Sequence, residues 1–244
     1  QLTWMDARVN GKVITPRYGK PVEINALWFN ALRCMQDFAE QIGAPSTAFA
    51  ELAEQTAIGF MRFDRGDGGG LFDVIDGPDG DDPSIRPNQI LEVSLPHSPV
   101  ENNALRWRII EECRDHLLTP FGLRSLSPTD PRYQGHYVGS AAKRDASYHQ
   151  GPAWGWLLGH FALAHYRAGG SADAAQALLE PMAQQLNEAA IGQLSEIYDG
   201  DAPHLARGAP AQAWTVACTL EAWWRIERAR HATASPSNDA KDTA

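Results

Sequence analysis

Residues 21–42 of the chain read PVEINALWFNALRCMQDFAEQI. Apolar side chains recur in this stretch at steps of three and four residues, which is the spacing of one face of an α-helix. Pro21 suits the first turn of a helix, and Gly43 suits the position just after its end. The stretch therefore predicts a long helix whose apolar face is made of Ile24, Leu27, Trp28, Ala31, Leu32, Met35, Phe38, Ala39 and Ile42.

Six further stretches carry helical periodicity. Ser46, Ser98 and Ser171 each stand where an N-cap is expected, and Pro99 follows Ser98 at the first helical position. No stretch alternates between apolar and polar residues over several positions, so the sequence predicts an all-α protein. The six predicted helices cover residues 47–63, 88–95, 99–118, 147–168, 172–189 and 209–231.

The connections between these helices fall into two classes of length. In an antiparallel array, successive connections lie alternately at opposite ends of the helices. Because short and long connections alternate along this chain, we expect all the short links at one end and all the long segments at the other. Irregular segments longer than about 12 residues are uncommon unless they are functional, and we expect the long ones to form the rim of an active site. This ordering is typical of an (α/α) barrel, and seven helices would leave about half of a twelve-helix ring missing. The short links are 44–46, 96–98 and 169–171, and the long segments are 1–20, 64–85, 119–146 and 190–208.

Charge and hydropathy indicate which kinds of partner, nucleic acid or membrane, the chain is not expected to bind. The net charge of −9 and the lack of a basic stripe argue against a nucleic-acid partner. No apolar run approaches the roughly 20 residues that cross a bilayer, so we expect no membrane partner. Three widely spaced cysteines, and the absence of a leader, indicate a cytoplasmic protein with free thiols. Because the chain opens with Gln1 directly on a motif, we expect further sequence upstream.

Residues 1–231 are expected to belong to one domain, and the polar residues 232–244 to form a disordered tail. The aspartates of the second long segment admit two interpretations, a calcium site or a solvated acidic loop. They do not follow the twelve-residue calcium-loop pattern, so we favour the acidic loop and expect no metal. The aspartates are Asp73, Asp76, Asp79, Asp81 and Asp82.

Motif-like strings concentrate in the long segments and at the helix starts beside them. In chain order they are TWMD (3–6), KPVEI (20–24), RPNQ (86–89), SPTDPRYQG (127–135), YHQGPAW (148–154), SEIYDG (195–200) and AQAW (211–214). Their order and spacing resemble the amylo-α-1,6-glucosidase domain of glycogen debranching enzymes over essentially residues 1–230. The resemblance implies a glucoamylase-like (α/α)6 barrel, of which this chain would supply the C-terminal half to two-thirds.

The same resemblance implies a pair of catalytic carboxyls. Matched to the family, Asp6 is the general acid and Glu196 is the general base of an inverting glycosidase, which needs no cofactor. Such enzymes hold the two carboxyls about 6.5–9.5 Å apart, with a water between them. The implied reaction is hydrolysis of α-1,6-linked glucose at a glycogen or limit-dextrin branch point. The partner would be the α-glucan substrate, and nothing in the sequence indicates a transferase site.

Other residues of these strings are candidate glucose ligands. Their side chains offer hydrogen bonds to sugar hydroxyls or flat rings for stacking, and Glu23 could instead orient Arg17. An ion pair with the loop aspartates remains an alternative for Arg17 and Arg86, and a structural role remains one for His149. The candidates are Trp4, Arg17, Glu23, Arg86, Asn88, Gln89, Tyr133, His149, Gln150, Trp154 and Gln212.

Two other functions stay open at this point. The chain could be a non-catalytic glucan-binding portion of a larger protein, or a related (α/α)6 glycosidase that acts on trehalose or another glucan. The residues by themselves do not define the linkage that is cut.

Overall fold

The structure is a computed structural model that describes residues 3–234 of the 244-residue chain. Its longer helices are α1 (Val22–Gln41), α2 (Thr47–Phe60), α4 (Asn103–His116), α6 (Trp156–Arg167) and α9 (Ala213–Ala234). Shorter helices are α3 (Ile90–Ser94), α5 (Ala141–Ser147), α7 (Ala172–Ala177) and α8 (Glu180–Gln185), with 3-10 turns at Met61–Phe63 and Pro87–Gln89. Among the described residues, no helix is long and apolar enough to cross a membrane.

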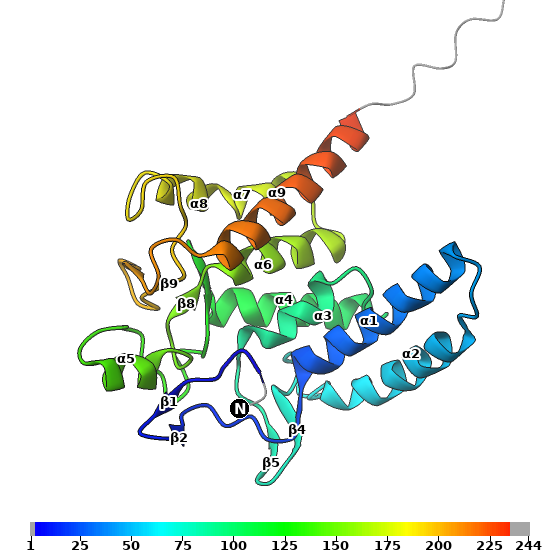
Figure 1. The fold of residues 1–244 in the computed structure, drawn as a ribbon, viewed down its shortest axis with the longest axis horizontal. Helices are drawn as coiled ribbons and strands as arrows, with labels where there is room; N and C mark the ends of the chain where they lie inside the picture. The colour runs from blue at the N-terminus through cyan, green and yellow to red at the C-terminus, as the bar shows by residue number, and fades with distance from the viewer. Residues whose placement is uncertain (1–2, 235–244) are drawn as a thin grey trace, which may run out of the picture.

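The helices form a row with a second layer outside it (Figure 1). Helices α1, α3, α6 and α9 pack side by side in that order, with α1 and α9 at the two ends of the row. Helix α2 packs against α1, α4 against α3 and α6, and α7 against α6 and α9. With the short helices α5 and α8 set aside, helices in chain order thus alternate between the row and the outer layer, as expected for part of an (α/α) barrel.

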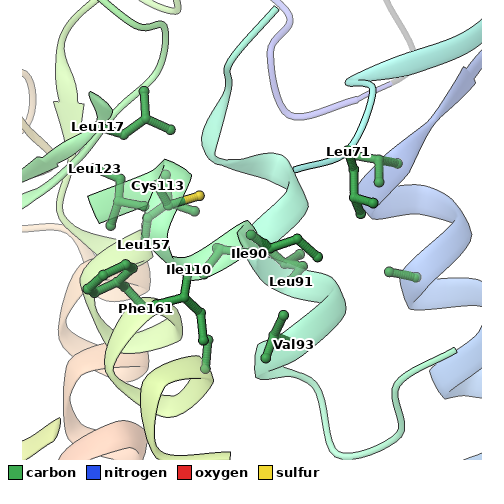
Figure 2. Close-up of a cluster of buried hydrophobic side chains, with 14 of the residues drawn as sticks. Leu71, Ile90, Leu91, Val93, Ile110, Cys113, Leu117, Leu123, Leu157 and Phe161 are labelled. Atoms are coloured by element: carbon green, nitrogen blue, oxygen red, sulfur yellow. The ribbon is translucent and has the colours of Figure 1, made fainter. Parts of the chain in front are cut away.

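The main hydrophobic core lies where α3, α4 and α6 meet (Figure 2). Ile90 of α3, Ile110 of α4, and Leu157 and Phe161 of α6 are each at most 2% exposed. Burial of each such side chain stabilises the fold by about 1.5–3 kcal/mol. This core holds the N-terminal ends of α3 and α6 in place, and with them the strings that precede these helices.

The prediction of an all-α protein is wrong in one respect, because the long segments contain short β-strands. A five-stranded antiparallel sheet has the order β10-β9-β8-β7-β6, and a three-stranded one has the order β3-β4-β5. Strands of two to four residues are too short to show alternation in the sequence. The first sheet contains Ala206–Arg207, Ile197–Tyr198, Ala153–Trp154, Gly122–Arg124 and Leu118–Thr119; the second contains Lys20–Pro21, Val74–Gly77 and Gly80–Asp82; Arg8–Val9 (β1) pairs with Lys12–Val13 (β2).

These sheets bring the long segments together, which confirms the expectation from helix order. The first sheet joins segment 119–146 to segment 190–208 through β8. The second sheet joins segment 1–20 to segment 64–85. Gln150 Nε2 donates to the Ile14 carbonyl at 3.4 Å, which links the two groups.

Several helix boundaries differ from those predicted. Helix α4 begins at Asn103 because Asn102 caps it, accepting from the N–H groups of Ala104 and Leu105. Ser98, the predicted cap, instead donates to the buried Glu92. The predicted helix 172–189 is broken into α7 and α8 at Leu178 and Leu179.

Further differences lie at helix ends, and helix α5 lies in a segment predicted to be irregular. Helix α6 begins at Trp156 instead of residue 147, because residues 153–154 pair as β8 and Pro152 before them lacks the N–H that a continuing helix would need. Helix α9 begins at Ala213 and runs to Ala234, so the predicted tail residues 232–234 are helical. The rest of the predicted tail, 235–244, lies outside the described residues.

Most of the predicted apolar face of α1 is exposed to solvent. Leu32 and Ala39 are buried as expected, and the helix packs on its neighbours through these and through Ala26 and Phe29. The remaining large side chains lie on the outward side, because in the described structure no further helix covers the free side of α1 at the end of the row. They are Ile24, Leu27, Trp28, Met35, Phe38 and Ile42, each at least 40% exposed.

Candidate active site

Three hydrogen-bond donors surround the carboxylate of Glu196, which lies just before β9. The Tyr148 hydroxyl donates to its Oε1, and Gln212 Nε2 donates to the same oxygen at 3.3 Å. The Ala209 N–H donates to Oε2 at 2.8 Å. Glu196 is therefore held in one orientation from three sides, with its side chain only partly buried.

Both predicted carboxyls influence the Tyr148 phenol, although only Glu196 is hydrogen-bonded to it among the contacts of the described residues. The pKa of Tyr148 is raised well above its ordinary value, first by burial and then by the hydrogen bond and charge of Glu196; the charge of Asp6 adds to the same effect. The influence of Asp6 is the smallest of these causes. That Asp6 and Glu196 face one pocket, with their carboxyls about 6.5–9.5 Å apart, stays a prediction.

Trp4 anchors the segment that carries Asp6. Its indole lies edge-on against the rings of His149, Trp154, Trp156 and Trp214, with centroid distances of 5.0–6.2 Å. Trp156 and Trp214 are stacked on each other at 4.0 Å. Edge-to-face pairs of this kind each contribute about 0.5–1.5 kcal/mol beyond burial, so the cluster fixes Trp4 firmly.

A buried polar network continues behind this aromatic cluster. Asn88 accepts from Trp4 Nε1 at 2.8 Å and donates to Asp73 at 2.7 Å. Arg86 is 2% exposed and donates to the carbonyl of His149 and to Gln150 Oε1. These bonds join strings that are distant in the sequence and hold them against one another.

Arg17 and Glu23 form part of the same network. The Arg17 guanidinium makes a two-pronged ion pair with Glu23 and a second pair with Asp73. The Arg86 Nε also lies 3.8 Å from Asp73. The alternative of ion pairs with a loop aspartate is therefore what the structure shows for Arg17 and Arg86.

Accessibility divides the predicted sugar ligands into two groups. Trp4, Tyr133 and Gln212 are partly exposed. The others are buried and form the supporting wall of the site; their hydrogen bonds are with protein atoms, except that neither ring nitrogen of His149 has a hydrogen-bond partner among the described residues. His149 in this group is neutral, because burial lowers its pKa to about 3. The buried candidates are Arg17, Glu23, Arg86, Asn88, Gln89, His149, Gln150 and Trp154.

A second group of polar residues lies beside Tyr133. The Tyr133 hydroxyl donates to Asp201 Oδ1 at 2.9 Å, and burial followed by this bond raises the pKa of Tyr133 to about 12. The imidazole of His136 lies 3.6 Å from Asp199 and 3.5 Å from Asp201. Arg207 pairs with Asp199 at 2.8 Å. Sequence reasoning named Tyr133 but missed His136, Asp199, Asp201 and Arg207, because these residues meet only through the pairing of distant loops.

Two aspartates of the acidic loop form ion pairs. Asp76 pairs with Lys20 and Arg62, and Asp73 pairs with Arg17, so these two carboxylates have cationic partners. In the described part of the chain, no group of three potential ligands is placed to hold a metal ion.

Comparison with known proteins agrees with this arrangement. A family model described as amylo-alpha-1,6-glucosidase matches residues 1–221. The glycogen debranching enzyme of Saccharomyces cerevisiae is 28% identical over 170 residues, which are 60% of this chain and 11% of the yeast protein.

Solved structures show the same fold. Two structures of the GH63 mannosylglycerate hydrolase from Thermus thermophilus, with Tris and with glucose, match with TM-scores of 0.61 and 0.59 at 19% and 20% identity. Each match covers 84% of this chain, and the chain spans 45% and 47% of the length of these structures. The mostly helical fold described here thus corresponds to about half of theirs. Because the family model matches most of its length, the chain belongs to the amylo-alpha-1,6-glucosidase family of glycoside hydrolases.

Proposed function

We propose that the chain carries the acid and base of an inverting glycosidase that releases glucose from α-1,6 branch points of glycogen or limit dextrin. The observation that carries this proposal is the Glu196 carboxylate held by three donors, and the charge of Asp6, which acts on the donor Tyr148, supports it. The family membership and the yeast relative support the choice of substrate. Residues 1–231 would belong to one catalytic domain, and the expected location is the cytoplasm, where glycogen would be the substrate.

In the proposed reaction, Asp6 gives its proton to the glycosidic oxygen while the bond from that oxygen to the anomeric carbon breaks. Glu196 takes a proton from a water molecule, whose oxygen attacks the anomeric carbon from the opposite face. The products are glucose with inverted configuration and the shortened glucan. Both carboxyls then return to their starting protonation through solvent.

The proposal is tested by glucose release from a limit dextrin, with the anomer of the product identified by NMR. Asp6→Asn and Glu196→Gln are each expected to reduce turnover at least 100-fold, the scale of proton-transfer catalysis. Glu188→Gln serves as the control, because Glu188 is an exposed residue of the preceding loop that contacts Gln185. Undiminished turnover in either active-site variant removes that residue from the mechanism.

A substrate panel separates this proposal from a related activity. The solved relatives are described as mannosylglycerate hydrolases, so mannosylglycerate belongs in the panel beside α-1,6, α-1,4 and α,α-1,1 glucosides. We expect the α-1,6 glucoside to be hydrolysed fastest. Binding of glucan without hydrolysis of any substrate would support a non-catalytic, glucan-binding role.

We also propose that further helices of the same polypeptide cover the outward face of α1. The chain spans less than half the length of the solved structures it matches, and α1 and α9 end the row of packed helices. The exposed side chains of α1 include Trp28 and Phe38, and α9 exposes Trp224. Large apolar side chains exposed together on one helix face mark an interaction site in soluble proteins.

A further inference from the structure

We propose that Tyr148 is the positioning residue of this site, whose hydroxyl holds Glu196 so that Oε2 receives the proton of the attacking water. The inference rests on the proposed function of Glu196 as general base. Tyr148 was not among the residues expected from the sequence to act in the site, although it opens the string at 148–154.

The Tyr148 ring is held rigidly. It packs against the rings of Tyr137, His149 and Trp154 at centroid distances of 5.4, 4.8 and 4.9 Å. Its backbone carbonyl accepts from Trp154 Nε1 at 3.1 Å. The position of its hydroxyl is therefore set by packing and does not follow movements of Glu196.

The hydrogen bonds distinguish the two oxygens of Glu196. A carboxylate has about four acceptor positions, two on each oxygen. Tyr148 and Gln212 occupy both positions of Oε1, whereas Oε2 accepts only the Ala209 N–H among the described donors. One acceptor position of Oε2 thus remains for a water molecule.

The backbone next to Oε2 keeps that position open. A Cβ placed on Gly208 would lie closer than 3.0 Å to Oε2, so a side chain there would displace the carboxylate. Tyr148 in turn remains a donor over the working pH range, because burial and the adjacent Glu196 raise its pKa. The hydroxyl can hold Oε1 but does not compete as a base for the water proton.

The first test compares Tyr148→Phe with Tyr137→Phe. Both variants keep the aromatic ring, but only the first removes a donor to Glu196. We expect Tyr148→Phe to reduce kcat about 10- to 100-fold, the factor for one hydrogen bond to a charged group, with KM changed less than about threefold. Tyr137→Phe is expected to keep kcat. Equal kcat values in the two variants would overturn the proposal.

A double-mutant cycle shows whether Tyr148 acts through Glu196. Combined with Glu196→Gln, Tyr148→Phe is expected to cause no further loss in turnover of α-glucosyl fluoride, an activated substrate with a good leaving group. A loss that multiplies with that of Glu196→Gln would mean general damage to the site, and would refute the positioning role. Full turnover in Glu196→Gln alone would instead refute the proposed function.

A crystal structure of Tyr148→Phe provides a readout that does not depend on turnover. We expect the Glu196 carboxylate to turn away from the Ala209 N–H or to occupy more than one orientation, while the Phe ring stays in place. A carboxylate that keeps the wild-type orientation would show that Gln212 and Ala209 suffice, and the proposal would be wrong.

Discussion

Replacement of Gly208 by alanine tests the geometry around Glu196 most directly. Gly208 has a φ of +67°, and an added Cβ would overlap Glu196 Oε2 and lie 3.0 Å from Ile197 Cγ1. Gly192, in the same loop, has a φ of +76° and no atom within 4 Å of the position of a Cβ. The pair therefore separates backbone strain from displacement of the carboxylate.

The structure allows the size of both effects to be worked out. Left-handed backbone costs a residue with a Cβ about 1–2 kcal/mol, which for a chain of this size lowers Tm by roughly 2–8 °C. Both alanine variants should show that loss. Only Gly208→Ala must also move Glu196 Oε2, by on the order of 1 Å, and a displacement of that size can reduce the rate about 100-fold.

The assay is glucose release from limit dextrin beside thermal unfolding of each variant. We expect similar Tm values for Gly208→Ala and Gly192→Ala, with kcat reduced about 100-fold in the first and nearly unchanged in the second. Equal kcat values at equal Tm would refute the arrangement of Gly208 against Glu196. The comparison stays informative even when both variants lose some stability, because the loss is shared.

Further outcomes follow from the buried charges and the exposed face. Asp73→Asn should lower the free energy of unfolding by about 3–5 kcal/mol, since buried Arg17 loses a carboxylate partner, as urea unfolding would measure. Burial raises the pKa of Glu92 to about 7, so the folded wild-type protein resists ionisation of this carboxyl and loses stability as pH rises from about 4.5 to 7. Glu92→Gln has no such group and should therefore gain stability relative to wild type over the same pH range. Burial lowers the pKa of His160 to about 4, and His160→Gln should gain stability relative to wild type as pH falls from about 6.5 to 4, by about 1.4 kcal/mol per pH unit. If the outward face of α1 is left uncovered, this chain should self-associate through it in sedimentation experiments. Trp28→Glu should reduce that self-association, because Trp28 is 53% exposed on this face; unchanged self-association would exclude the face as the contact surface.

Local sequence was sufficient for the positions of most helices. The three- and four-residue periodicity of 21–42 predicted α1 to within a residue at each end, because periodicity reflects the geometry of the helix itself. Local signals misplaced one cap: the sequence predicted Ser98, whereas Asn102 caps α4. Strands such as β8 were not predicted, because a strand of two residues is too short to show the alternation of apolar and polar residues.

The functional strings were also visible in the sequence, and the family they resemble is the one to which the chain belongs. Their individual roles were not visible. Arg86 and Asn88 have the chemistry of sugar ligands, yet both are buried with protein partners. Burial depends on which segments pack over a residue, and that is not encoded in its neighbours along the chain.

The series of helices, the length of the segments between them, and the acidic residues available for chemistry can be read along the chain, because helix formation depends on contacts within one or two turns. The fold was needed to show that the Tyr148 hydroxyl reaches Glu196, 48 residues further along the chain, and that α1 turns much of its apolar face outward. The surroundings of a carboxylate, and the side of a helix that is covered, result from packing between segments far apart in the chain.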